Sequence, residues 1–302
     1  MLRLESSVEA MGSTYSVVLY GPDREVLEHA AELAFDEARR LDDELSNYKP
    51  ESPWSQVNRH AAERPVPVPV ELFDLLSACL NYSKRSEGAF DITVGPLMRV
   101  WGFYKGSGHL PKPGDVKMAM TRVGYRNIKL DAATHSVRFA KTGVEMDPGG
   151  IGKGFAVDKM AEILRKAGIE IALISGSGSS IYAMGAPPGE KGWTISIRDP
   201  HQETKTVQDI VLKDESLSTS GSYEKFFEAD GRVYAHIMDP RTGYPARGML
   251  SVSVITPRTI DSEAWCKPFF INGRAWAAQH KPEGSRAYFC EDKTQTECVW
   301  LQ

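Results

Sequence analysis

The chain has 302 residues, of which 41% are hydrophobic and 25% charged, and its net charge at pH 7 is −4. These values are those of a globular protein with a substantial core, and we expect one domain over residues 1–302, or two intimately packed subdomains. The slight negative charge argues against nucleic acid as a partner, and no apolar run approaches the roughly 20 residues of a membrane span.

The N-terminus and the cysteines bear on the cellular compartment. The first residues, Met-Leu-Arg-Leu-Glu-Ser-Ser, have no signal-peptide core. We therefore expect a cytoplasmic protein as the sequence stands, or a periplasmic or cell-envelope protein if a leader was removed. The four cysteines form no metal-type CxxC pair. Cys290 and Cys298 could face each other across a hairpin, but two buried thiols are favoured over a disulfide.

The first third of the chain predicts a strand followed by two amphipathic helices. Residues 8–20 alternate and end at a Gly-Pro pair, which indicates a strand. Residues 23–45 place apolar side chains at helical spacing, and residues 70–86 repeat that pattern. The proline-rich residues 51–69 between these helices are predicted to form a loop.

Two side chains in this region have both a structural and a binding interpretation. Tyr48 follows the first helix; its ring could pack on the helix end, which we favour, or offer a platform to a flat ligand. Asp91 lies between Phe90 and Ile92 in an otherwise apolar stretch, so its carboxylate must be paired or hydrogen-bonded. It could cap the next helix or bind a polar ligand edge, and the residues alone favour neither.

The centre of the chain carries a glycine-rich turn, Met146–Asp158 (MDPGGIGKGFAVD), which leads into a helix predicted over about 154–167. Glycines remove the Cβ atoms that keep a ligand off the backbone, helix-start N–H groups attract anions, and Lys153 adds a positive charge. Asp147 and Asp158 frame the turn and could serve a metal or a sugar hydroxyl. A tight connection without a ligand is equally compatible with this stretch alone, whose spacing fits neither familiar nucleotide motif.

The remaining elements are predicted to be mostly strands. Residues 97–115 read as a short helix and a loop, and the hydroxyl-rich residues 217–223 as a polar loop or a lining for a phosphate. A further helix is expected to open at about Thr259. Strands are expected over residues 123–130, 136–144, 169–175, 193–198, 207–212 and 250–256, with two more in the last 25 or so residues.

Two side chains in the C-terminal part also invite chemistry. His236 ends a strand-like run before the turn Asp239-Pro-Arg-Thr-Gly. It could act as a general base near neutral pH, although alone a core histidine that donates to a carbonyl is favoured. Asp261 lies in the first turn of the last helix, where Thr259 or Asp261 would be the cap and a metal ligand is the alternative.

Taken together and in order, these stretches resemble the ApbE family, the FAD:protein FMN transferases. Several spaced motifs over nearly the full chain are more specific than any one of them. The matching segments are Met11-Gly-Ser, Leu45-Ser-Asn-Tyr48, Gly88-Ala-Phe-Asp91, the glycine-rich turn, Ser218-Thr-Ser-Gly221, His236-Ile-Met-Asp-Pro-Arg-Thr-Gly-Tyr-Pro245 and Thr259-Ile-Asp261.

The resemblance implies a mixed α/β (α+β) fold with a T-fold-like core, in which mixed or antiparallel sheets are flanked by helices. It implies an enzyme that takes FAD as substrate and Mg²⁺ as cofactor. The FMN half would pass to a Thr or Ser hydroxyl of an acceptor protein, a subunit of a redox complex, with release of AMP. Gly150, through its carbonyl, and Asp261 would hold the metal, and His236 would be the base. The implied flavin-contacting positions are Met11, Tyr48, Ala89, Phe90, Asp91, Asp147, Lys153 and His236.

The sequence departs from the family pattern at the helix that carries Asp261. The family's second oxygen ligand, often threonine, would stand four residues later, where Trp265 cannot bind a metal. Glu263 could substitute, or Lys267 could place a cation where the metal charge is expected. Two other functions fit the same residues: an FAD pyrophosphatase, in which water replaces the acceptor hydroxyl, and a flavin-binding protein without catalysis.

Overall fold

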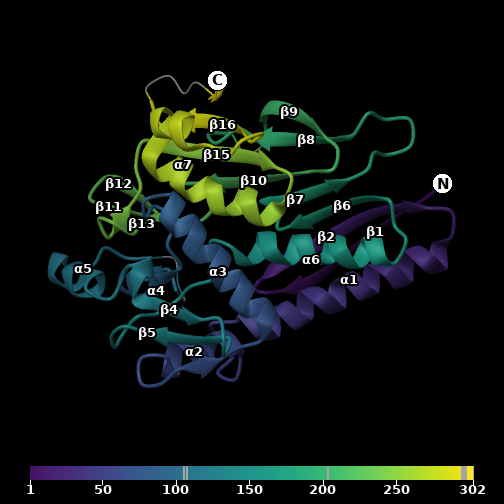
Figure 1. Ribbon diagram of the computed structural model, residues 1–302. Helices are drawn as coiled ribbons and strands as arrows, with labels where there is room; N and C mark the ends of the chain where they lie inside the picture. The colour runs from purple at the N-terminus through teal and green to yellow at the C-terminus, as the bar shows by residue number, and fades with distance from the viewer. Residues whose placement is uncertain (105, 107, 203, 294–297, 302) are drawn as a thin grey trace.

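The structure, a computed structural model, describes residues 1–104, 106, 108–202, 204–293 and 298–301. Its centre is an eight-stranded sheet in which each neighbouring pair of strands is antiparallel (Figure 1). A mixed α/β fold with antiparallel sheets, as the resemblance implied, is confirmed. In spatial order the strands are β1 (Leu2–Ala10), β2 (Ser13–Gly21), β6 (Ile171–Gly176), β7 (Ser180–Met184), β10 (Glu215–Gly221), β15 (Met249–Thr256), β16 (Arg286–Glu291) and β17 (Cys298–Trp300).

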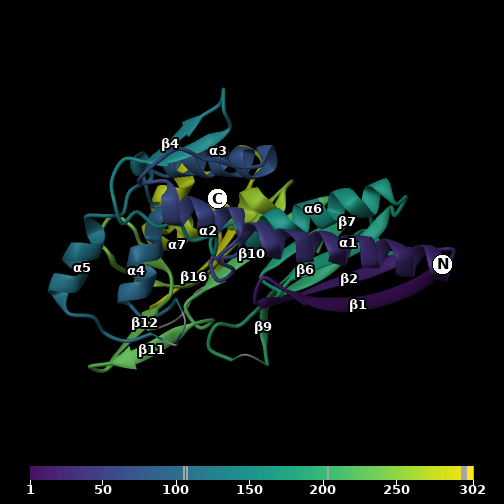
Figure 2. The ribbon, with the colours of Figure 1, turned by 90° about the horizontal axis from the view of Figure 1, so that it is seen from below.

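Three long helices, α1 (Arg24–Leu45), α6 (Gly152–Lys166) and α7 (Thr259–His280), cover one face of the sheet (Figure 1). α1 contacts β1 and β2, α6 contacts β6 and β7, and α7 contacts β10 and β15. α6 lies between the other two and packs against both, as the view from below also shows for α1 (Figure 2). The N-terminal ends of α6 and α7 are therefore held by the same core.

Strand alternation explains how the sheet packs on both faces. Val17 and Leu19 of β2 point into the core beneath the helices, whereas Val18 and Tyr20 join a second apolar cluster. A hairpin of β8 (Trp193–Arg198) and β9 (Thr206–Leu212) supplies the other side of that second cluster. The sheet is thus buried by helices on one face and by a hairpin on the other.

A second group of shorter elements lies at the end of the molecule away from the N-terminus (Figures 1 and 2). These elements together contact α1 and α7 and surround the buried Trp101. They are α2 (Pro53–His60), α3 (Val70–Arg85), α4 (Gly95–Val100), α5 (Pro113–Met120), the 3₁₀ turns η1 (Ile92–Val94) and η2 (Tyr125–Asn127), the sheet β3 (Val66–Pro67), β5 (Ser136–Phe139) and β4 (Ile128–Asp131), and the pairs β11 (Phe226–Ala229) with β12 (Arg232–Ala235) and β13 (Met238–Asp239) with β14 (Tyr244–Pro245).

Three predictions about these elements were wrong, each for an identifiable reason. Residues 8–20 are not one strand but parts of β1 and β2, joined at Met11-Gly12, where both residues have positive φ (54° and 65°) as a tight hairpin requires. The predicted loop 51–69 contains α2, which begins with a Ser52 cap and a proline in the first turn. Residues 217–223 fall largely in β10, whose serine hydroxyls bond to Ser262 of α7 inside the core.

The prediction of two buried thiols was also wrong. Cys290 and Cys298 are register partners in β16 and β17 and form a disulfide. The other two cysteines, Cys79 and Cys266, are free and buried. In the part of the chain that the structure describes, no helix is both long enough and apolar enough to cross a bilayer.

Candidate active site

The glycine-rich turn forms the entrance to α6 and is shaped by its own first carboxylate. Asp147 Oδ1 accepts a hydrogen bond from Gly149 N at 2.7 Å, and the N–H groups of Ile151 and Gly152 donate to the Pro148 carbonyl. Asp147 Oδ2 accepts from the Asn47 amide at 3.3 Å, which ties the turn to the end of α1. Burial raises the pKa of Asp147.

Glycine is needed in the turn because two helices meet there. A Cβ on Gly154 would lie 2.5 Å from the Thr259 carbonyl oxygen and 2.9 Å from Glu263 Oε2, so α6 could not approach α7. A Cβ on Gly150 would lie 3.6 Å from the Phe90 ring and 3.7 Å from Lys267 Cε. The turn is therefore a tight helix–helix contact at Gly154, whereas at Gly150 it faces the side chains of Phe90 and Lys267.

A cavity of about 110 Å³ opens at the turn and gathers residues from four separate parts of the chain. Six predicted site residues line it, together with Lys267. The lining residues are Ala89, Phe90, Asp91, Ile92, Val94, Met98, Asp147, Gly149, Gly150, His236, Ile237, Met238, Pro240 and Lys267. A neighbouring cavity of about 340 Å³ shares Asp91 and Pro240 with it, so a ligand larger than the first cavity has a continuous surface to follow.

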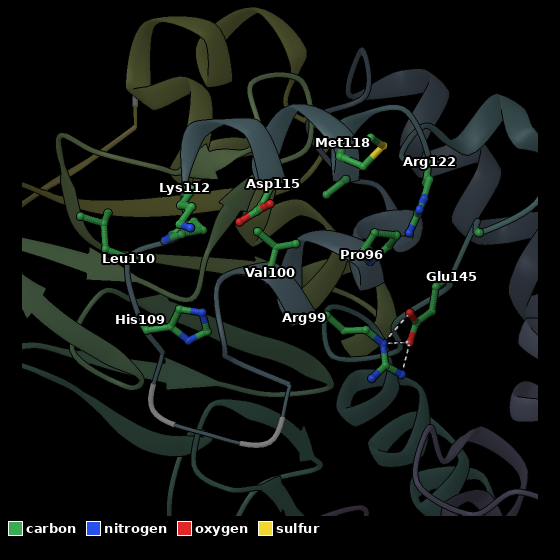
Figure 3. Close-up of a pocket in the computed structure, with 13 residues that line it drawn as sticks. Pro96, Arg99, Val100, His109, Leu110, Lys112, Asp115, Met118, Arg122 and Glu145 are labelled. Atoms are coloured by element: carbon green, nitrogen blue, oxygen red, sulfur yellow. Dashed lines mark hydrogen bonds and ion pairs between the residues drawn. The ribbon is translucent and has the colours of Figure 1, made fainter.

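The largest of these cavities, about 550 Å³, is lined by residues of α4 and α5 (Figure 3). Arg99 and Glu145 form an ion pair at its edge, and Lys112, Asp115 and Arg122 also line it. None of the predicted site residues lines this cavity. Its size alone therefore does not make it the candidate active site.

Asp91 has the capping role that was one of its two predicted interpretations. Its Oδ1 accepts from the N–H and the hydroxyl of Thr93 at 2.7 and 2.6 Å and caps η1, while Oδ2 accepts from Tyr125 N at 2.6 Å. The side chain is buried, and burial raises the pKa of its carboxyl. Because Asp91 also lines both smaller cavities, its capping role holds a wall of the site in place.

His236 lines the same cavity and lies between β12 and β13. Its Nδ1 is 3.1 Å from the Lys225 carbonyl oxygen. A carbonyl only accepts, so this contact favours the tautomer with the proton on Nδ1 and an unprotonated Nε2. Burial and the nearby ammoniums of Lys267 and Lys153 lower the pKa of His236 to about 4. The imidazole is therefore neutral at pH 7 and can accept a proton.

A buried carboxylate, Glu263, lies beneath the glycine turn with two lysines beside it. Its Oε2 accepts from Gly154 N, and its Oε1 is 3.6 Å from Lys153 Nζ and 3.7 Å from Lys267 Nζ. Only 2% of the Glu263 side chain is exposed. Burial lowers the pKa of Lys267, and the Glu263 carboxylate opposes that effect.

Met11 and Tyr48 lie beside the site without lining the cavity. The Met11 methyl group is 3.1 Å from the position of a Cβ on Gly152. Tyr48 is 61% exposed, so its ring does not pack against the end of α1 as we favoured from the residue alone. It contacts Tyr104 with ring centroids 5.1 Å apart and donates to the Tyr104 carbonyl. Sequence reasoning missed Tyr104, which carries no motif of its own.

Asp261, the predicted metal ligand, is not among the residues that line the cavity. Its Oδ1 accepts from the Tyr82 hydroxyl. The prediction that Thr259 or Asp261 caps α7 was wrong. Instead, Asp158 of α6 accepts hydrogen bonds from the N–H groups of Thr259 and Ile260 at 2.7 and 3.0 Å. Within the described residues, no group of three or more His, Cys, Asp or Glu side chains could hold a metal.

These features define a class of protein: a mixed α/β protein in which a glycine-rich turn at a helix start, Lys267 and a neutral imidazole line one cavity. Lys153 lies beside the same turn, 3.6 Å from Glu263. Such a set of groups suits the binding and cleavage of a phosphate ester or diphosphate. The chain belongs to the ApbE family, whose sequence model matches residues 11–289.

Similar proteins cover most of the chain. It is 35% identical over 244 residues to an FAD:protein FMN transferase of Treponema pallidum, covering 76% of this chain and 67% of that protein. It is 32% identical over 290 residues to an FAD:protein FMN transferase of Klebsiella pneumoniae, covering 94% of this chain and 87% of that protein.

Two solved structures have the same fold. The ApbE protein of Thermotoga maritima superimposes with a TM-score of 0.90 at 29% identity, covering 98% of this chain and 96% of that one. The apo form of the flavinyl transferase ApbE from Pseudomonas stutzeri superimposes with a TM-score of 0.85 at 29% identity, covering 99% of this chain and 94% of that one.

Proposed function

We propose that this protein is an FAD:protein FMN transferase that attaches FMN through a phosphoester bond to a Thr or Ser hydroxyl of an acceptor protein. The observation that carries the proposal is the meeting of the glycine turn, Lys267 and His236 at one cavity. Family membership and the names of the relatives support it. The proposed acceptor is a subunit of a redox complex, as the resemblance implied.

In the proposed reaction the acceptor hydroxyl attacks the phosphorus of the FMN half of FAD. The bond from that phosphorus to the bridging oxygen breaks, and AMP leaves with that oxygen. His236 Nε2 takes the proton of the hydroxyl, while Nδ1–H stays bound to the Lys225 carbonyl and keeps the ring oriented. Lys153 and the backbone at Gly149 and Gly150, which a ligand can approach closely, bind the diphosphate. The exposed ring of Tyr48 offers a face to the flat part of the ligand.

The resemblance implies Mg²⁺ with Gly150 and Asp261 as ligands, and the positions of these two residues do not fit a shared metal site. Gly150 lines the cavity, but Asp261 does not and is bonded to Tyr82. The free oxygen of the buried Glu263 already faces two ammonium groups. No step of the proposed mechanism is therefore assigned to a metal ion.

The proposal is tested by incubating the protein with FAD and a threonine-bearing redox-complex subunit encoded near its gene. A flavin-labelled acceptor on a fluorescent gel, with one AMP released per label, is the expected result. AMP without a labelled acceptor would instead identify an FAD pyrophosphatase. FAD that is bound but stays intact would identify a flavin-binding protein without catalysis.

A further inference from the structure

Lys267 of α7 brings a second lysine to the glycine turn. It lines the cavity with Gly149, Gly150 and His236, and its Cε lies 3.7 Å from the point that a Cβ on Gly150 would occupy. Its side chain is 22% exposed. The ammonium is therefore held at the cavity wall, at the place where the turn would meet a phosphate.

The charges around Glu263 do not cancel. Its buried carboxylate carries one negative charge, whereas Lys153 and Lys267 carry two positive charges 3.6 and 3.7 Å from Oε1. Oε1 has no hydrogen-bond partner among the described residues. Within this group of three side chains, two ammonium groups share one carboxylate, so each keeps N–H donors for an anion such as a diphosphate.

We infer that the ammonium of Lys267 takes the place of a divalent cation beside the glycine turn. This inference rests on the proposed function. Together with Lys153, Lys267 binds the diphosphate of FAD and neutralises the charge that develops as AMP leaves. FAD binding by this chain then needs no metal ion at this position.

The surroundings of Glu263 explain why a divalent cation does not fit there. A magnesium ion lies about 2.0–2.1 Å from its oxygen ligands. An ion on Oε1 would lie within about 6 Å of both ammonium groups and be repelled by each. Trp265 is buried, with the Arg85 guanidinium 5.0 Å from its ring centroid, so that side of α7 offers no ligand.

Helical spacing supports the same inference. In the family pattern, an acid at the helix start is followed four residues later by a second oxygen ligand. Glu263 and Lys267 are four residues apart and in contact, and both lie at the turn. If Glu263 rather than Asp261 is the acid of the pattern, a lysine stands at the position of the second ligand while the carboxylate is retained.

The first test measures FAD affinity by flavin fluorescence with EDTA and with magnesium. The wild type and Lys166→Gln, a change at an exposed lysine of α6, should each bind FAD equally well in both conditions. Lys267→Gln should bind FAD about 10- to 100-fold more weakly in EDTA, because a charge-assisted hydrogen bond is lost. Circular dichroism confirms that each variant is folded.

The second test uses Mn²⁺ and electron paramagnetic resonance on flavin-free protein, and needs no turnover. The wild type should bind no Mn²⁺, whereas Lys267→Thr, which removes the ammonium and adds an oxygen, should bind it and need a divalent cation to bind FAD. Wild-type Mn²⁺ binding that Glu263→Gln abolishes would overturn the inference, as would wild-type FAD affinity that falls in EDTA. Metal-independent FAD binding without FMN transfer would support the inference and contradict only the proposed function.

Discussion

Replacement of His236 is the most informative single perturbation of the proposed mechanism. His236→Asn can still donate to the Lys225 carbonyl but cannot take a proton from the acceptor hydroxyl. General-base catalysis is worth about 10²- to 10⁴-fold, so we expect transfer to slow by that factor while FAD affinity changes little. His29→Asn, a change at an exposed histidine of α1, is the matched control and should leave both unchanged.

The lowered pKa of His236 adds a pH dependence with a definite sign. With a pKa of about 4, only about one imidazole in a thousand is protonated at pH 7. The base form is lost as pH falls through that value, so kcat/KM should stay flat from pH 8 to about 5. An unshifted histidine would halve the rate near pH 6.5. A midpoint near 6.5, or a His236→Asn variant that transfers at the wild-type rate, would refute the assigned role.

Three further predictions concern the frame of the site. Gly154→Ala should destabilise the fold by about 1–3 kcal/mol in chemical denaturation, whereas Gly114→Ala, where a Cβ meets nothing within 4 Å, should not; equal midpoints would contradict the close helix contact. Reducing the disulfide between Cys290 and Cys298 should lower the free energy of unfolding by about 2.5 kcal/mol. A denaturation midpoint that reductant leaves unchanged would contradict this stabilising role. Tyr48→Ala should weaken FAD binding by about 2- to 10-fold without changing the melting temperature; unaltered affinity would exclude the platform role.

The sequence predicted best those elements whose signal is local. α1 and α3 were predicted within one residue of their observed ends because each buries a continuous apolar stripe. β15 and the β8–β9 hairpin were likewise recognisable from short apolar or alternating runs. By contrast, the β1–β2 hairpin was missed because alternation continued across its two-residue turn.

Interactions between distant segments could not be read from the sequence. The α7 cap comes from Asp158, about 100 residues earlier, so the local cap candidates at the helix start were misleading. The serines of β10 resembled a polar loop because their partner, Ser262, lies on another element. Glu263 and Lys267 were noticed only as substitutes for a ligand, since their joint approach to the turn depends on how α6 and α7 pack.

The most direct test of the central proposal is mass spectrometry of the acceptor after incubation with this protein and FAD. We predict that the acceptor gains one FMN, joined with loss of water at a Thr or Ser, and that one AMP appears for each FMN attached. An acceptor of unchanged mass, in the presence of FAD that the protein demonstrably binds, would contradict the proposed transfer.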